Sequence, residues 1–336
     1  MTDSVLVVLA AASLATATAV AAAPLAALER FELRFANEGV ALAGTLLQPP
    51  GDSLPAVMLI QGSGQSGRDN RWAMSVAEAL AGCGVAVLIP DKRGSGESGG
   101  DWRTAGFEEL AADARAGFEQ LRTRPGIDPS RIGYFGLSQG GHVAPLAAAR
   151  TPGAAFAVNM AGSVQVMEQQ LYDELEFAYR EHGIDDATIA WLQEFARMSF
   201  DYLRTGRGFE RYLARHREIS AGPLAKAAET WPTSEDDAYW EFWRKVHDFD
   251  PVPWWRQLAA RGIPALFIYG AEDHNVNVAA SADRIASGIS AHGSTLRIYQ
   301  GTGHSLRDES GRLRSDMIAD TCKWLHAVPR RPRPGE

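Results

Sequence analysis

Segments of strand length alternate with segments of helical period along most of the chain, and this alternation constrains the fold more than any other feature. Six short apolar segments are predicted strands, at residues 56–60, 85–89, 131–135, 154–159, 265–269 and 295–299. Apolar residues recur at helical spacing at residues 72–81, 107–121, 279–289 and 313–325. Strands that alternate with helices predict βαβ units, and therefore an α/β protein with a mainly parallel central sheet and helices on both faces.

The region before the first of these strands has a different pattern. Residues 31–35 and 40–47 are predicted strands, joined by the turn-rich tripeptide Asn37-Glu38-Gly39, so we expect an antiparallel hairpin at the start of the domain. The 336 residues are 46% hydrophobic and 22% charged, which is the composition of a globular protein that can bury a full core.

One serine lies between two glycines where the strand at 131–135 ends and an Ala-rich helical pattern begins. The pentapeptide Gly136-Leu137-Ser138-Gln139-Gly140 fits the G-x-S-x-G pattern, in which a tight strand-to-helix turn exposes a nucleophilic serine. Small flanking residues allow the close backbone approach that such a turn needs. The pattern is common, and a Gly-rich turn without catalytic role is the competing interpretation.

The loops after two later strands contain the groups that could activate this serine. "GAEDHNV" follows the strand at 265–269 and contains Asp273, while "QGTGHSL" follows the strand at 295–299 and contains His304. Parallel strands bring their carboxyl ends to one edge of the sheet, so these loops should meet Ser138 there. The order Ser138, Asp273, His304 is that of α/β-hydrolase triads, and it predicts nucleophile, orienting acid and general base.

Several more side chains compete for these roles. His142 lies one turn along the helix after Ser138, and we expect it to pack locally. His274 adjoins Asp273, which leaves little room for productive geometry. Asp248 or Asp250 would replace Asp273 as the acid if the strand assignment shifted. We expect Asp91 and Arg93, in the loop after the strand at 85–89, to form a buried ion pair that fixes the loop; these competing residues are all visible in the sequence.

Three stretches, "LIQGSGQSGRDN", "IPDKRGSGES" and "GLSQGGHVAPLAA", resemble bacterial carboxylesterases of the α/β-hydrolase superfamily. These esterases are related to dienelactone hydrolases and to the catalytic domains of prolyl-oligopeptidase-like peptidases, and the resemblance covers residues 30 to 328. It implies an oxyanion hole made by the backbone N–H groups of Gln139 and Ser63, with Gly64 as the alternative second donor. Many such esterases have Glu after the nucleophile, whereas this chain has Gln139.

The residue types predict a serine esterase that cleaves a small-molecule ester through an acyl-enzyme. A serine hydroxyl needs a base such as His304 to remove its proton during attack. A prolyl-oligopeptidase-type peptidase is the first alternative, disfavoured because no propeller segment precedes the domain and no acidic pair for a peptide amino terminus is evident. Thioester hydrolysis, acyl transfer and non-catalytic binding are also compatible with this fold.

Residues 165–247 interrupt the alternation. They are rich in charged and aromatic residues and have helical periodicity, which predicts a helical cap inserted into a core formed by residues 30–164 and 248–328. The cap contains four of the nine tryptophans, which we expect mainly to pack its interior and in part to line an acyl pocket. Trp254 and Trp255 follow it, as an exposed patch or as the hinge where the cap rejoins the sheet.

The N-terminal segment predicts export to the periplasm or medium. Residues 5–23 are almost wholly apolar and end in Ala21-Ala22-Ala23, which is typical of a signal peptide cleaved after residue 23. The segment has Asp3 and no Lys or Arg before its apolar run, so an uncleaved anchor and a misassigned start are alternatives.

Composition excludes several partner classes. The net charge of −8 gives no basic footprint for nucleic acid, and no His, Asp or Glu spacing suggests a metal, so we expect no cofactor. Cys83 and Cys322 could pair or stay free; the apolar surroundings of Cys83 favour a small buried side chain. The sequence leaves the oligomeric state open.

Overall fold

The computed structural model describes residues 28–229, 231–289 and 293–331, and the predicted signal peptide, residues 1–23, lies outside them. The described residues form one sheet of eight strands in the order β1-β2-β4-β3-β5-β6-β7-β8. The pairs β1–β2 and β2–β4 are antiparallel and the remaining pairs are parallel, and the predicted hairpin is β1 and β2. The strands span β1 (Glu29–Asn37), β2 (Val40–Gln48), β3 (Leu54–Ile60), β4 (Ala86–Pro90), β5 (Ile127–Leu137), β6 (Ala157–Met160), β7 (Ala265–Gly270) and β8 (Ser294–Tyr299).

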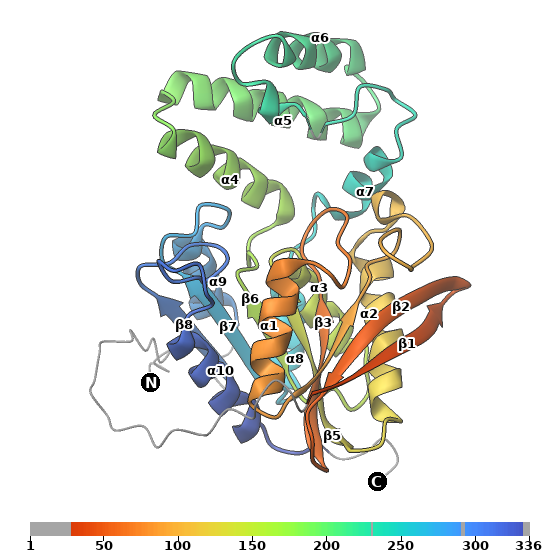
Figure 1. Ribbon diagram of the computed structural model, residues 1–336. Helices are drawn as coiled ribbons and strands as arrows, with labels where there is room; N and C mark the ends of the chain where they lie inside the picture. Colours follow the sequence, from red (N-terminus) through yellow and green to blue (C-terminus); the bar gives the residue numbers. More distant parts are fainter. Residues whose placement is uncertain (1–27, 230, 290–292, 332–336) are drawn as a thin grey trace.

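Helices cover both faces of the sheet, which confirms the predicted α/β-hydrolase fold (Figure 1). Side chains of β3 alternate between two buried clusters, with Met58 facing one and Val57 the other, because successive residues of a strand point to opposite faces. One face is covered by α1 (Arg71–Gly82) and α10 (Ser315–Ala327). The other is covered by α2 (Phe107–Arg122), α3 (Gly140–Ala149), α8 (Val252–Ala260) and α9 (Val278–Gly288).

Four of the helices that the described residues form between β6 and β7 lie beyond the carboxyl edge of the sheet (Figure 1). They are α4 (Met167–Glu181), α5 (Asp186–Thr205), α6 (Phe209–Ser220) and α7 (Tyr239–Val246), called here the inserted helices. Among the described residues, short 3₁₀ turns lie at Trp102–Thr104 and Ala225–Ala227. The start of α4 contacts the residues that follow α7, so the two ends of this segment lie together. Met167 N donates to Phe249 O at 3.1 Å, and Glu168 N donates to His247 O at 2.9 Å.

Aromatic side chains form most of the interior of the inserted helices. Phe195 stacks on Tyr212 with ring centroids 5.3 Å apart, and Trp231 stacks on Trp243 at 5.3 Å. Trp240 is fully buried among them. Aromatic pairs add to the stabilisation that comes from area burial, and they give these helices a packed interior of their own.

The structure decides between alternatives that the sequence leaves open for the tryptophan pair and for the two cysteines. Trp254 and Trp255 do not form an exposed patch: Trp255 lies in α8 and packs on Phe267 of β7 with ring centroids 4.6 Å apart, while Trp254 is half-buried. Cys83 is not simply a small buried hydrophobe. It forms a disulfide with Cys322 of α10, and the two Cα atoms lie 6.2 Å apart.

Candidate active site

The predicted nucleophile lies on the turn between β5 and α3. Ser138 has φ +50°, a conformation that a non-glycine residue holds only when its surroundings fix it. Its N–H donates to Met160 O at 2.9 Å and its carbonyl accepts from Gly141 N at 2.7 Å. A Cβ on Gly136 would lie 2.1 Å from Gly140 O, so the turn needs glycine there. The sequence forms an elbow here because only such small residues permit this approach.

The structure brings the three predicted triad residues together. His304 Nε2 lies 3.0 Å from Ser138 Oγ, and His304 Nδ1 lies 2.8 Å from Asp273 Oδ2. Asp273 is 5% exposed, and its Oδ1 also accepts hydrogen bonds from the N–H groups of Asn275 and Val276. With the carboxylate so fixed, the imidazole can receive the serine proton at Nε2 while Nδ1–H stays bonded to Asp273.

The competing histidines and acids have different partners. His142 is buried in α3 and its ring stacks on Phe107 with centroids 5.4 Å apart; burial lowers its pKa to about 4. His274 Nδ1 lies 2.6 Å from Glu181 Oε2. Asp250 pairs with Arg284 at 2.7 Å, and Asp248 is exposed. None of these contacts leads to Ser138.

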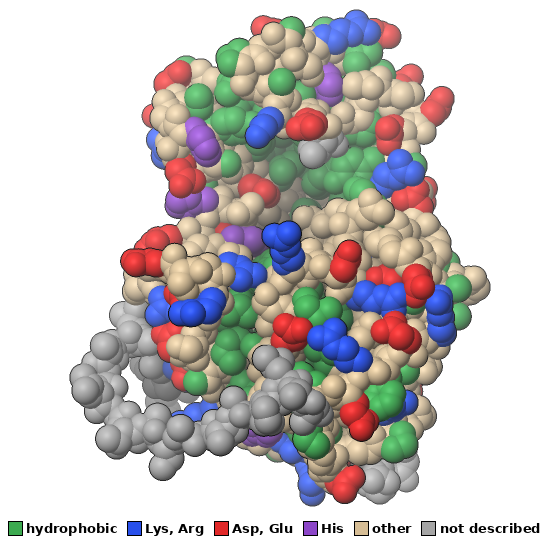
Figure 2. All heavy atoms as spheres, in the orientation of Figure 1, with side chains coloured by type: hydrophobic (Ala, Val, Ile, Leu, Met, Phe, Trp, Pro, Cys, Tyr) green, Lys and Arg blue, Asp and Glu red, His purple; other side chains and the backbone are tan. Residues whose placement is uncertain are grey.

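A cavity of about 310 Å³ opens beside Ser138 and His304, between the carboxyl edge of the sheet and α4. Figure 2 shows a hollow between the inserted helices and the core, with hydrophobic side chains along part of it. Ser63 and Gln139, the two residues predicted to stabilise an oxyanion, both line the cavity. Gly62 lies close to the nucleophile, because a Cβ on it would be 3.6 Å from Ser138 Cβ.

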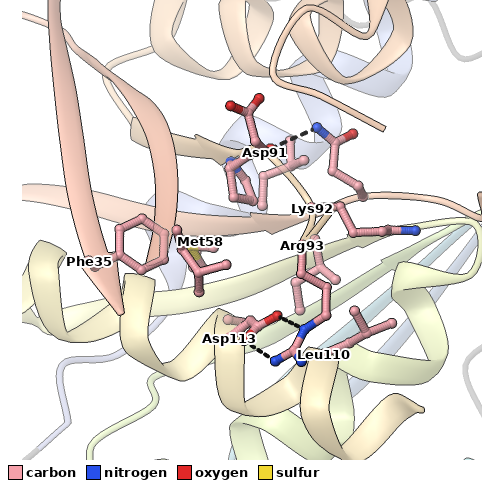
Figure 3. A pocket seen from close by; sticks show the side chains of 13 residues that line it. Phe35, Met58, Asp91, Lys92, Arg93, Leu110 and Asp113 are labelled. Carbon is pink, nitrogen blue, oxygen red and sulfur yellow. Dashed lines mark hydrogen bonds and ion pairs between the residues drawn. The ribbon is translucent and has the colours of Figure 1, made fainter. Parts of the chain in front are cut away.

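The loop after β4 contains two separate cation–anion pairs, so the predicted Asp91–Arg93 ion pair is wrong. Asp91 accepts hydrogen bonds from the N–H groups of Arg68 and Glu97, and its Oδ2 lies 3.4 Å from Arg68 Nε. Arg93 instead forms a two-pronged pair with Asp113 of α2, with both N···O distances 2.6 Å (Figure 3). The sequence could not assign these partners because they come from different elements.

Two groups near the cavity were not singled out from the sequence. Lys92, between Asp91 and Arg93, is 8% exposed, and burial lowers its pKa to about 7. The tetrapeptide Asp91-Lys92-Arg93-Gly94 was a usable signal, since it follows a strand at the catalytic edge. Glu174 of α4 lines the cavity, and burial raises its pKa.

The described part of the chain supplies no obvious place for a metal ion. Within residues 28–229, 231–289 and 293–331, no three His, Cys, Asp or Glu side chains gather in a way that could hold one. In the same ranges, no helix combines the length and the apolar character needed to cross a membrane.

Comparison with known proteins identifies the family to which the sequence belongs. A family model described as X-Pro dipeptidyl-peptidase (S15 family) matches residues 38–302. An uncharacterized protein of Mycobacterium tuberculosis is 39% identical over 121 residues, which are 36% of this chain. The chain thus matches about two fifths (41%) of the length of that curated relative.

Solved structures share the fold at low identity. An esterase of Pyrococcus furiosus has 16% identity and a TM-score of 0.59, over 90% of this chain and 92% of that one. An α/β hydrolase of Penicillium has 17% identity and a TM-score of 0.60, over 90% and 99%. A proline iminopeptidase of Mycobacterium smegmatis has 16% identity and a TM-score of 0.57, over 88% and 98%.

Proposed function

We propose that the chain, which belongs to the X-Pro dipeptidyl-peptidase (S15) family of serine hydrolases, hydrolyses carboxylic esters through an acyl-enzyme on Ser138. The observation that carries the proposal is the continuous chain of hydrogen bonds from Ser138 Oγ to His304 and on to Asp273. Ser138 and His304 both line the cavity, so a substrate there can reach them. A serine with this relay and an accessible face is equipped for acyl transfer.

The proposed reaction has two halves. Ser138 Oγ attacks the ester carbonyl while His304 Nε2 takes its proton, and Asp273 stabilises the imidazolium that results. The tetrahedral oxyanion is held by the N–H groups of Ser63 and Gln139. His304 then gives the proton to the leaving alkoxide, the C–O bond breaks, and the alcohol departs. Water repeats the sequence against the acyl-enzyme and releases the acid.

The polar wall of the cavity favours an ester over a peptide with a free amino terminus. Such a terminus is a cation, and an ionised carboxylate would bind it best. Glu174 is the carboxylate that α4 offers to the cavity, but burial raises its pKa. Its oxygens accept from Asn275 Nδ2 at 3.2 Å and from Gln170 Nε2 at 3.1 Å. An ester needs no such anchor.

A dipeptidyl-peptidase is the second candidate. The description of the matched family favours it, and Glu174 is the group that would then bind the substrate amine. The two candidates use the same relay and differ in what the cavity wall recognises.

The test compares the protein with its Ser138→Ala variant on p-nitrophenyl esters from acetyl to dodecanoyl and on an Xaa-Pro p-nitroanilide. We expect Ser138-dependent ester turnover and no anilide cleavage, with a chain-length optimum set by the cavity. Faster anilide cleavage would move the assignment to the peptidase, and Glu174→Gln should then raise KM for the anilide and leave ester KM unchanged. Absence of turnover on both, together with no labelling of Ser138 by a fluorophosphonate, would refute a serine hydrolase at this site.

A further inference from the structure

Lys92 places a buried cation directly behind the loop that is predicted to hold the oxyanion. Its Nζ donates hydrogen bonds to Gly62 O, to Gly64 O at 3.0 Å and to Gln139 Oε1 at 3.3 Å. An ammonium has three N–H donors, so these three oxygens match it one to one. Burial of an ammonium is unfavourable, and the hydrogen bonds to these two loops offset part of that cost.

The first of these bonds fixes the direction of a backbone N–H. No cis peptide bond occurs among the described residues, so the oxygen of Gly62 and the N–H of Ser63 point to opposite sides of their shared peptide. Because Gly62 O faces Lys92, the Ser63 N–H faces away from Lys92. Ser63 lines the cavity beside Ser138, which makes this N–H a candidate donor to the reacting carbonyl. A cation on the carbonyl oxygen also polarises the peptide and strengthens the same N–H as a donor.

The third bond reaches the second predicted donor. Gln139 binds Lys92 with its side chain, while its backbone N–H directly follows the nucleophile. Among the described residues, neither this N–H nor that of Ser63 has a hydrogen-bond acceptor. One ammonium therefore contacts both segments whose N–H groups must converge on one oxygen.

We propose that Lys92 is a positioning residue that aligns the Ser63 and Gln139 N–H groups as the two oxyanion donors. The inference rests on the proposed function, since it matters only if an acyl oxyanion forms at Ser138. It also explains why a neutral Gln139 suits this chain: its amide oxygen accepts from Lys92 without neutralising the ammonium.

The neighbouring cation provides a matched control. Arg93 leaves the same loop in another direction and pairs with Asp113 of α2, with no contact to the Ser63 loop (Figure 3). Arg93→Met should weaken stability by disrupting this pair and leave kcat unchanged.

The experiment measures kcat, KM and the inhibition constant of a trifluoromethyl ketone for Lys92→Met and Arg93→Met, with active sites counted by fluorophosphonate titration. The ketone adds to Ser138 Oγ and forms a tetrahedral oxyanion. For Lys92→Met we expect kcat to fall by about 100- to 1,000-fold, as when an oxyanion donor is lost, with KM changed by less than about threefold. The inhibition constant should rise by the factor by which kcat/KM falls, because both report the tetrahedral state. An unchanged kcat, or a loss of kcat without weaker ketone binding, would overturn the proposal.

A second measurement needs no variant and covers the case in which Lys92→Met does not fold. In the ¹⁵N-labelled wild-type protein, the Ser63 and Gln139 amide protons should move downfield when the ketone adduct forms. A downfield shift at Gly64 in place of Ser63 would contradict the proposed alignment. Failure of the proposed function itself is distinguishable, because the wild-type protein would then form no Ser138 adduct.

Discussion

At the scale of single residues, Lys92 shows how a buried ionisable group lowers stability. Its pKa is lowered by burial from 10.5 to about 7, so the folded protein releases this proton at a lower pH than the unfolded chain does. Between these pH values the unfolded state binds more protons, and the contribution of Lys92 to the free energy of unfolding rises with pH. The unfavourable contribution is fully present below pH 7 and disappears as the pH approaches 10.5.

This sign gives a prediction for the pH dependence of stability. The free energy of unfolding of Lys92→Met, minus that of the wild type, should be most favourable to the variant near pH 6 and should decrease toward pH 10. Urea denaturation of both proteins across this pH range measures this difference in the free energy of unfolding. The hydrogen bonds lost in the variant shift the difference by the same amount at every pH, so they do not change its slope against pH. Parallel stability curves would show that Lys92 does not titrate in this range.

At the scale of elements, the turn between β5 and α3 works only because three backbones come very close. A Cβ on Gly140 would lie 2.3 Å from Ile60 O, the carbonyl at the end of β3. That atom is backbone and cannot move aside without displacing the strand that leads to the Ser63 loop. The first turn of α3 therefore fixes the distance between the nucleophile and the oxyanion loop.

Gly140→Ala should consequently destabilise the protein by about 1–3 kcal/mol or more and lower kcat, because overpacking at a backbone contact shifts the turn. The matched control is Gly82→Ala at the end of α1, where a Cβ would meet nothing within 4 Å. That variant should be neutral or up to about 1 kcal/mol more stable, since alanine favours a helix more than glycine does. Urea denaturation and ester turnover of both variants test this prediction. Equal stabilities would show that the contact between Gly140 and Ile60 O is not tight.

The same elements explain how much the sequence could predict. Ser138 and His304 could be placed because each follows a parallel strand, and the carboxyl ends of such strands share one edge. The partners of Asp91 and Arg93 could not, because Arg68 and Asp113 come from a loop and a helix whose positions depend on packing. Lys92 was missed for a related reason: its importance arises from three oxygens on two loops, and no periodicity indicates where these converge.

At the scale of the whole molecule, the Cys83–Cys322 disulfide ties the end of α1 to α10 across 239 residues of sequence. Because it closes nearly the entire domain into a loop, replacing both cysteines by serine should lower the free energy of unfolding by about 2–5 kcal/mol. Turnover at room temperature should persist, since neither cysteine lines the cavity. Guanidinium denaturation with and without reductant checks this prediction: reductant should destabilise the wild type and leave the double variant unchanged, and equal midpoints for all samples would contradict it.

The disulfide also bears on where the protein works. Such bonds persist in oxidising compartments, and with the apolar residues 5–23 this supports our proposal that the protein is exported. N-terminal sequencing of the protein recovered from cell fractions tests it: a cytosolic protein that retains residue 1 would argue against export.

The paired ends of the inserted helices have a consequence for how such a protein can diversify. Met167 and Phe249 lie side by side at the junction, and β6 and β7 pair directly in the sheet. A gene rearrangement that exchanges the codons between Met167 and Phe249 would therefore replace the inserted helices and leave the sheet continuous. Substrate choice and bond-breaking chemistry could then evolve as separate traits, and a laboratory chimera can be designed with two splice points that are neighbours in space.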